Sequence, residues 1–237
     1  MIVATGLTDI GCKRSQNEDR ILVELDSGIF AVADGMGGHQ CGARAAELAT
    51  SALQEYFRSH ASESPHQAMT MAIQFANETV LRESVAAPEC SGMGCTVSAV
   101  TIENALAIVG NVGDSRVYLY RRGELLQLTR DDSVLAKLLQ SGAITPEDAP
   151  THPLRNMLTQ SVGTNEAVDI QISELTLAAG DRLLLSTDGL HGVITDSAIA
   201  EILVVETDPA EAARKLIAAA CECGGPDNVS CIVINYL

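Results

Sequence analysis

The chain has 237 residues, 46% of them hydrophobic, which is enough to bury the core of one large domain or of two small ones. Its formal net charge of −16 disfavours nucleic acid and anionic membrane surfaces as partners, and an aromatic content of 3% without tryptophan disfavours stacking platforms for single-stranded nucleic acid. The N-terminus has no basic segment ahead of its short apolar start, and no run approaches the ~20 apolar residues of a membrane span. We therefore expect neither a signal peptide nor a membrane anchor.

The cysteines are scattered and odd in number: Cys12, Cys41, Cys90, Cys95, Cys221, Cys223 and Cys231. A chain of this size can bury a sufficient core without covalent cross-links. We therefore expect seven reduced thiols in a cytoplasmic protein, which we expect to be a monomer.

The first two thirds of the chain predict strands and a pair of helices. Period-2 and fully apolar runs predict strands, and apolar residues at helical spacing predict the helices. Short Glu-Asn, Gly-Asp and Arg-Gly breaks separate the later strands, as in hairpins. The expected strands are residues 2–7, 21–25, 29–33, 95–102, 105–110, 116–120 and 125–128, and the expected helices are residues 43–57 and 65–83.

Residues 133–165 have a different character. Ser133 is a suitable N-cap for a short helix, Thr145 resembles a second helix start, and residues 151–165 have the pattern of an exposed loop. Beyond them we expect strands at 168–177, 182–186 and 229–236 and helices at 196–205 and 209–222.

The order of these elements predicts the fold class. Short turns between consecutive strands favour antiparallel sheets, and helices in adjacent pairs favour α+β layers over a doubly wound parallel fold. We find no repeat and no linker, and we therefore expect one domain over residues 1–237.

One apolar strand, residues 29–33, ends at Asp34, and three glycines follow within four residues. Asp-Gly is a common hairpin turn, because both residues tolerate a positive φ. Alternatively, Asp34 is a metal ligand, and the glycines allow the backbone to approach a bound ion or phosphate closely.

Other acidic residues occupy similar places. Asp188 follows the apolar run 183–185, Asp227 directly precedes the last strand, Asp114 lies in a glycine-rich turn, and Asp19 precedes a strand. Carboxylates at the ends of rigid strands are suited to hold hard divalent cations, and a pair of such ions lowers the pKa of water between them. Arg14 lies nearby in sequence and offers a planar fork for phosphate oxygens.

Six segments together resemble a known family, the metal-dependent Ser/Thr protein phosphatases of type 2C in their compact bacterial form. In order and spacing they are TDIGCKRSQNEDR, VADGMGGH, GNVGDSRVYLYR, HPLRNMLTQSVG, LLLSTDGL and GGPDNVSCIVI. The resemblance covers nearly the whole chain. It implies a four-layer α-β-β-α sandwich in which two antiparallel β-sheets are flanked by pairs of antiparallel helices, with metals in a cleft at one end.

The resemblance also implies a metal site for Mn²⁺ or Mg²⁺. Asp34 would bridge two ions, and the Gly35 carbonyl would bind one of them. Asp188 and Asp227 would complete the ligand set, and Asp19 would act mainly through bound water.

Three further residues have implied roles. Asp114 matches the acid that bacterial relatives use for a third, weaker metal, and Arg14 matches the phosphate-binding arginine. Glu18 is expected to orient a metal-bound water or Arg14 rather than to bind metal directly.

The implied reaction is the single-step hydrolysis of phosphoserine and phosphothreonine in proteins by a metal-bridging hydroxide, opposing a bacterial Ser/Thr kinase. A cysteine phosphatase is excluded because no cysteine belongs to a C-x₅-R motif. Two alternatives remain: a catalytically inactive regulator that binds phosphoproteins, and a hydrolase of small phosphate esters.

The sequence departs from the family pattern at three places. Some relatives have histidine where this chain has Met36, which leaves His39, His152 or metal-bound water as the proton donor. Cys95 stands where relatives often have threonine, and Asp132 where they often have histidine. Asp132 begins the part of the chain, about 129–165, that corresponds to the family's flap over the substrate site.

Overall fold

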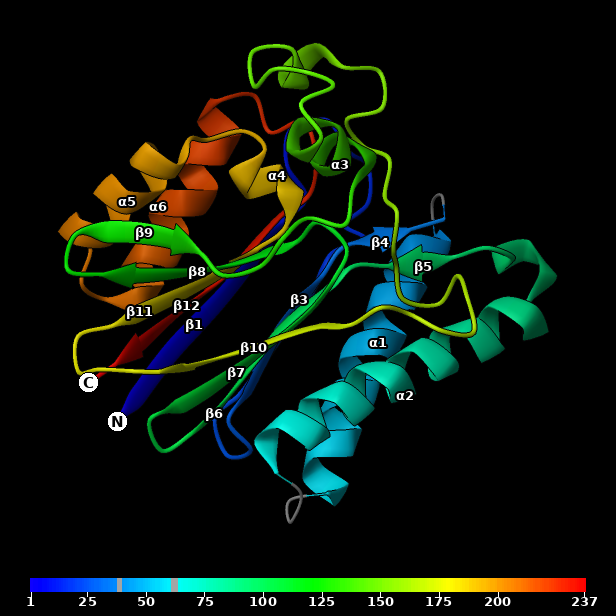
Figure 1. The fold of residues 1–237 in the computed structure, drawn as a ribbon, viewed down its shortest axis with the longest axis horizontal. Coiled ribbons are helices and arrows are strands. Elements are labelled where there is room, and N and C mark those ends of the chain that lie inside the picture. The colour runs from blue at the N-terminus through cyan, green and yellow to red at the C-terminus, as the bar shows by residue number, and fades with distance from the viewer. Residues whose placement is uncertain (38–39, 61–63) are drawn as a thin grey trace.

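A computed structural model describes residues 1–37, 40–60 and 64–237. Two five-stranded sheets face each other at its centre (Figure 1), with strand orders β1-β12-β11-β8-β9 and β10-β7-β6-β3-β2, and every strand pair is antiparallel. A small separate ladder joins β4 to β5. The strands are β1 (Ile2–Asp9), β2 (Arg20–Glu24), β3 (Ile29–Ala33), β4 (Gly35–Met36), β5 (Gly94–Cys95), β6 (Val97–Glu103), β7 (Leu106–Val112), β8 (Arg116–Arg121), β9 (Glu124–Gln127), β10 (Gln171–Thr176), β11 (Arg182–Ser186) and β12 (Val229–Tyr236).

Helices cover the outer face of each sheet (Figure 1). The pair α1 and α2 packs on the sheet that contains β3, and α5 and α6 pack with α4 on the sheet that contains β12. The helices are α1 (Gln40–Ser59), α2 (Pro65–Ala86), α3 (Val134–Gln140), α4 (Asp188–His191), α5 (Asp196–Val205) and α6 (Pro209–Glu222), with short 3-10 turns η1 (Pro88–Cys90) and η2 (Ala149–Thr151). This arrangement confirms the α+β class and the four-layer sandwich.

Three hydrophobic cores hold the layers together. One lies between the sheets, and one lies between each sheet and its helices. The inner strands β3 and β11 are therefore buried on both faces, which explains why their sequences, IFAVA and RLLLS, lack a simple alternation of apolar and polar residues.

The region between β9 and β10 differs in part from the prediction. Ser133 caps α3 as expected, since its Oγ accepts a hydrogen bond from the Ala136 N–H. The expected helix start at Thr145 is wrong: Thr145 bonds to the Asp148 carboxylate in a closed turn, and only η2 follows. Pro150 has no backbone N–H to continue an α-helix from this point.

The prediction of seven reduced thiols is also wrong. Cys41 and Cys90 form a disulfide, whereas Cys12, Cys95, Cys221, Cys223 and Cys231 are free. The two bonded residues are separated by 49 positions, so only folding brings them together. Among the described helices, none is long and apolar enough to cross a membrane.

Phe30 tests the core between the sheets. Its side chain is fully buried there, so Phe30→Ala should lower the free energy of unfolding by about 3–5 kcal/mol through lost burial and a residual cavity. Urea unfolding measures this change. The control Leu126→Ala removes a side chain that is 58% exposed and should change stability by less than about 0.5 kcal/mol; equal losses in the two variants would contradict the assignment of this core.

Candidate active site

The registers of the two sheets bring several strand ends to one edge of the sandwich. In one sheet the end of β3 pairs with the starts of β2 and β6. In the other sheet the end of β11 pairs with the starts of β12 and β8. Residues that directly follow or precede these strands therefore meet, although they come from all parts of the sequence.

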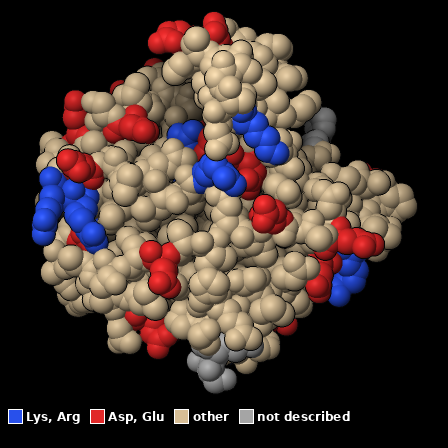
Figure 2. All heavy atoms as spheres, viewed as in Figure 1, with Lys and Arg blue, Asp and Glu red and all other residues tan. Residues whose placement is uncertain are grey.

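A cleft of about 480 Å³ lies at this edge. Figure 2 shows acidic and basic side chains close together near the upper centre of the face it presents, beside a hollow in the surface. The described residues that line the cleft are Arg14, Ser15, Gln16, Glu18, Asp34, Gly35, Met36, Gly37, Thr96, Asp114, Asn156, Leu158, Asp188, Asp227 and Asn228.

The carboxylates in and below the cleft raise one another's pKa. Burial, and then the charges of Asp19, Asp188, Asp114 and Asp227, hold the pKa of Asp34 well above its ordinary value. Burial raises the pKa of Asp19 and of Asp114 to about 7, and burial together with Asp227 raises that of Asp188. Such a cluster is unfavourable without a compensating positive charge.

Among the described residues, the buried side-chain atoms without a hydrogen-bond partner include two carboxylate oxygens, Oδ1 of Asp19 and Oδ1 of Asp188. The charge of Asp188 is one of those that raise the pKa of Asp34, so these two carboxyl groups lie close together. Buried carboxylate oxygens without a partner fit a hard divalent cation, which takes oxygen ligands. In the described part of the chain no three His, Cys, Asp or Glu side chains are already grouped around one point.

Hydrogen bonds account for the places of Asp19 and Asp227. Oδ2 of Asp19 accepts from Thr187 Oγ1 at 2.8 Å and from Ser230 Oγ at 2.7 Å, so Asp19 lies beneath the cleft rather than in its wall. Oδ2 of Asp227 accepts from Arg14 Nη2 at 2.7 Å, and this bond raises the pKa of the arginine. Arg14 remains 54% exposed and can reach a ligand in the cleft.

The structure does not support the turn explanation of the Asp-Gly pairs. A Cβ on Gly35 would lie 2.1 Å from the Gly42 carbonyl oxygen, and a Cβ on Gly189 would lie 1.9 Å from the Asn228 carbonyl oxygen. Neither glycine has a positive φ. Both therefore permit close backbone approach rather than a turn, and the second approach brings Asp188 beside the segment of Asp227.

Several residues that support the site were not identified from the sequence. Thr96 Oγ1 accepts a hydrogen bond from the Asp34 N–H at 3.0 Å and bonds to Ser115 Oγ at 2.7 Å. The Asn228 side chain binds three backbone groups of the segment around Arg14: it accepts from the Glu18 N–H and donates to two carbonyls. The sequence did offer one signal, because Asn228 is a polar residue directly after the candidate ligand Asp227.

His191 is a further residue that the sequence did not single out. It lies one turn after Asp188, its Nδ1 bonds to Ser186 Oγ at 2.9 Å, and its ring also bonds to the backbone of Asp114. Burial and the charge of Arg116 lower the pKa of His191 well below its ordinary value. A neutral imidazole can accept from Ser186 and donate to the Asp114 carbonyl, and so links the segments of Asp188 and Asp114.

Of the two histidines considered as proton donors, the structure places only His152. His39 lies outside the described residues. His152 is in the flap segment, where its Nδ1 accepts from the Leu154 N–H, and it is not among the described residues that line the cleft. The flap segment contributes Asn156 and Leu158 to the cleft wall instead.

Glu18 and Asp132 connect the site to its surroundings. Glu18 lines the cleft, its Oε2 lies against the Gly42 backbone, and its charge raises the pKa of Arg14. Asp132 exchanges backbone and side-chain hydrogen bonds with Gly113, directly before Asp114. The base of the flap segment is thereby attached to the turn that carries Asp114.

Comparisons with known proteins give a consistent result. A family model described as protein phosphatase 2C matches residues 13–228. The serine/threonine protein phosphatase PstP of Mycobacterium tuberculosis is 36% identical over 231 residues, and the protein phosphatase PhpP of Streptococcus pneumoniae is 32% identical over 247 residues. The match covers 97% of this chain in both cases, but 44% of PstP and 95% of PhpP, so the chain spans less than half the length of the first relative.

A solved structure agrees. The catalytic domain of PstP in complex with two manganese ions superposes with a TM-score of 0.90 at 32% identity, covering 99% of this chain and 97% of that one. The fold class and the resemblance to the type 2C phosphatases are thus confirmed.

The pH dependence of metal-free stability tests the carboxylate cluster. The pKa of Asp19 and of Asp114 is about 7 in the folded chain, whereas the ordinary value, which applies to the unfolded chain, is 3.8. Between pH 3.8 and pH 7 the folded state therefore binds more protons than the unfolded state. The stability of chelator-treated protein should therefore fall as pH rises from about 5 to about 8. Urea unfolding at both pH values measures this fall.

The variant Asp114→Asn should make this pH-dependent loss of unfolding free energy smaller by on the order of 2 kcal/mol, because it removes one carboxyl group whose pKa is raised in the folded chain. Asp26→Asn, in the exposed β2–β3 turn, is the control and should leave the fall unchanged. A pH profile that Asp114→Asn does not alter would show that the charges in the cleft are already compensated.

Proposed function

The chain belongs to the protein phosphatase 2C family, and from this premise we propose that it is a metal-dependent phosphatase that hydrolyses phosphoserine and phosphothreonine in proteins. The observation that carries the proposal is the convergence of Asp34, Asp188 and Asp227 in one cleft that also contains Arg14. PstP is named a serine/threonine protein phosphatase and PhpP a protein phosphatase, and the catalytic domain of PstP has been solved with two manganese ions.

The ligand set consists of oxygen donors. In the proposal Asp34 and the Gly35 carbonyl hold two ions together with Asp188 and Asp227, and Asp19 acts from below through water. Asp114 is proposed to hold a third ion. Two Mn²⁺ or Mg²⁺ ions would lower the pKa of water in the cleft and neutralise negative charge on a phosphoryl group.

The chain's own residues bind and orient the substrate. Arg14 is proposed to form a bidentate pair with the phosphoryl oxygens, which can reach its guanidinium because the side chain is 54% exposed. Its bond to Asp227 sets its position before substrate arrives, and Asn228 fixes the backbone on which it stands. This preorganisation lowers the cost of ordering the arginine when the phosphate binds.

The proposal also covers the extent of the catalytic domain, its substrates and its location in the cell. The described residues act as one catalytic domain, residues 1–237, in which the flap segment 129–165 forms one wall of the cleft through Asn156 and Leu158. We expect phosphorylated proteins as substrates, including targets of a Ser/Thr kinase that the phosphatase opposes, and we expect a monomer. Five free cysteines favour action in the cytoplasm, where thiols stay reduced.

Asp188→Ala tests the metal-dependent reaction. Loss of one ligand should reduce Mn²⁺ affinity in calorimetry and should lower the hydrolysis of a chromogenic phosphate ester by more than about a hundredfold. The exposed-turn variant Asp26→Ala should retain both properties. Equal rates for wild type and Asp188→Ala, with or without Mn²⁺, would exclude the proposed reaction and favour a regulator that binds phosphoproteins without cleaving them.

A substrate comparison tests the class. Phosphoserine and phosphothreonine peptides should be hydrolysed with a higher kcat/KM than small phosphate esters at the same Mn²⁺ concentration, because peptides also contact the flap wall. A preference for the small esters would identify a small-molecule hydrolase on this fold.

Arg14→Ala tests the phosphate-binding role. Loss of a charge-assisted pair should lower kcat/KM for a phosphopeptide by about 10- to 100-fold. Arg14→Lys should recover part of this loss, because it keeps the charge but not the planar fork. Arg58→Ala on α1 is the matched control, and unchanged Mn²⁺ affinity in Arg14→Ala separates substrate binding from metal binding.

A further inference from the structure

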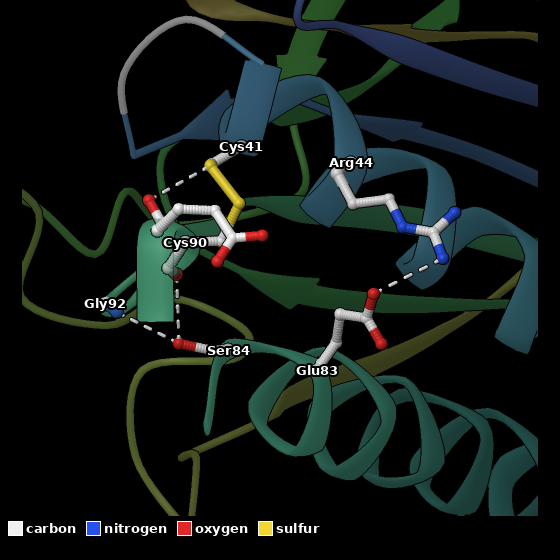
Figure 3. The surroundings of a disulfide bond; sticks show 7 residues. Cys41, Arg44, Glu83, Ser84, Cys90 and Gly92 are labelled. Carbon is white, nitrogen blue, oxygen red and sulfur yellow. Dashed lines mark hydrogen bonds and ion pairs between the residues drawn. A yellow bond between two sulfur atoms is a disulfide. The ribbon is translucent and has the colours of Figure 1, made fainter. Parts of the chain in front are cut away.

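A second cavity, of about 440 Å³, lies beside the cleft, and the Cys41–Cys90 disulfide forms part of its wall. Gln16 lines both cavities. Figure 3 shows Cys41 on the first turn of α1 and Cys90 on the short helix η1 that follows α2. The disulfide thus joins two segments that both lead directly into the catalytic cleft.

These segments carry two of the proposed metal ligands. Before α1, the chain forms β4 with Gly35, and after η1 it forms β5, which pairs with β4. Directly after β5, Thr96 donates its backbone N–H to the Asp34 carbonyl at 2.9 Å and accepts the Asp34 N–H on its Oγ1 at 3.0 Å. The disulfide is therefore a covalent closure behind the ladder that positions Asp34 and the Gly35 carbonyl.

Cys90 packs against the core beneath α1 and α2, and its other described polar contacts are local or exposed. Ser84 Oγ bonds to the Cys90 carbonyl at 3.3 Å and to the Gly92 N–H at 2.9 Å, and both bonds connect η1 to the end of its own helix α2. The ion pair between Arg44 of α1 and Glu83 of α2, at 3.5 Å, joins two partly exposed side chains, and such pairs stabilise little (Figure 3). The disulfide is the strong link between the start of α1 and η1.

A reductant can reach this disulfide. Cys90 is partly exposed, Cys41 is 8% exposed, and both face the second cavity. In a compartment that keeps the other five cysteines reduced, a reachable disulfide is exchangeable.

We propose that Cys41 and Cys90 are a thiol–disulfide exchange site that takes a dithiol reductant, and that reduction weakens metal binding by the Asp34–Gly35 segment. The proposal rests on the proposed function for the assignment of these two metal ligands. Reduction removes the covalent link and leaves the start of α1 and η1 held by packing and by the β4–β5 ladder alone, so metal binding must order a looser segment.

The exchange is balanced in thiols and electrons. A thiolate of the dithiol attacks Sγ of Cys90, the more exposed residue of the pair, and Cys41 leaves as a thiolate that takes up a proton. The second thiol of the reductant then attacks the mixed disulfide, which releases Cys90 as a thiol and the reductant as an intramolecular disulfide. Two electrons pass from the dithiol to the Cys41–Cys90 pair.

Calorimetric titration of Mn²⁺ tests the proposal on three forms of the full chain. The first is treated with oxidised glutathione, the second is reduced with dithiothreitol and desalted without oxygen, and the third is the double variant Cys41→Ala/Cys90→Ala. Peptide mapping after alkylation establishes the state of the two cysteines. The reduced form and the double variant should bind Mn²⁺ about tenfold more weakly than the oxidised form. Loss of a residue that orients a metal ligand typically lowers metal affinity by this amount. Reoxidation should restore the wild type alone.

Cys223→Ala is the matched control, because Cys223 is exposed and free, and it should keep both the Mn²⁺ affinity and the response to reduction. Circular dichroism shows whether the double variant is folded. The reduced wild type compares Mn²⁺ affinity with and without the disulfide in a chain that carries no substitution. Equal Mn²⁺ affinity in the oxidised and reduced forms would overturn the exchange proposal alone. Two free thiols at positions 41 and 90 after oxidising treatment would also overturn it, and absence of Mn²⁺ binding in every form would overturn the proposed function with it.

Discussion

Repulsion among buried carboxylates at one edge of a rigid sandwich is the constraint on which the rest of this structure depends. Asp34, Asp188, Asp114 and Asp19 are each held where burial and neighbouring charge raise the pKa. A scaffold accepts such strain only if other parts of the fold are strong enough to maintain it. Here the two central sheets and their three hydrophobic cores supply that strength.

The scaffold holds the acids by close backbone approach and by neutral hydrogen-bond partners. Gly35 and Gly189 leave no room for a side chain, so the chain segments on either side come into direct contact. Hydroxyl and amide groups, such as those of Thr187 and Asn228, satisfy the remaining polar atoms without adding charge. Among the described carboxylates, Oδ1 of Asp19 and Oδ1 of Asp188 remain buried without a partner, and carboxylate oxygens are what a hard cation binds.

Two attachments reach this edge of the sandwich. The base of the flap segment bonds through Asp132 to Gly113, directly before Asp114. The Cys41–Cys90 disulfide joins α1 to η1, and the β4–β5 ladder lies between these segments and Asp34. The first attachment is one residue from a carboxylate, whereas the second acts on Asp34 only through the ladder, which is the route that the exchange proposal uses.

Sequence alone determined the layered α+β fold, nearly all of its strands and helices, and the acids Asp34, Asp188 and Asp227, because hydrophobic period, turn residues and strand-terminal carboxylates are local patterns. Only the tertiary structure decided that Gly35 and Gly189 serve close packing rather than turns, that Cys41 pairs with Cys90, and that His191 and Asn228 support the site. Those facts are distances between segments remote in the chain, and no local pattern encodes which remote backbone will lie against a given residue.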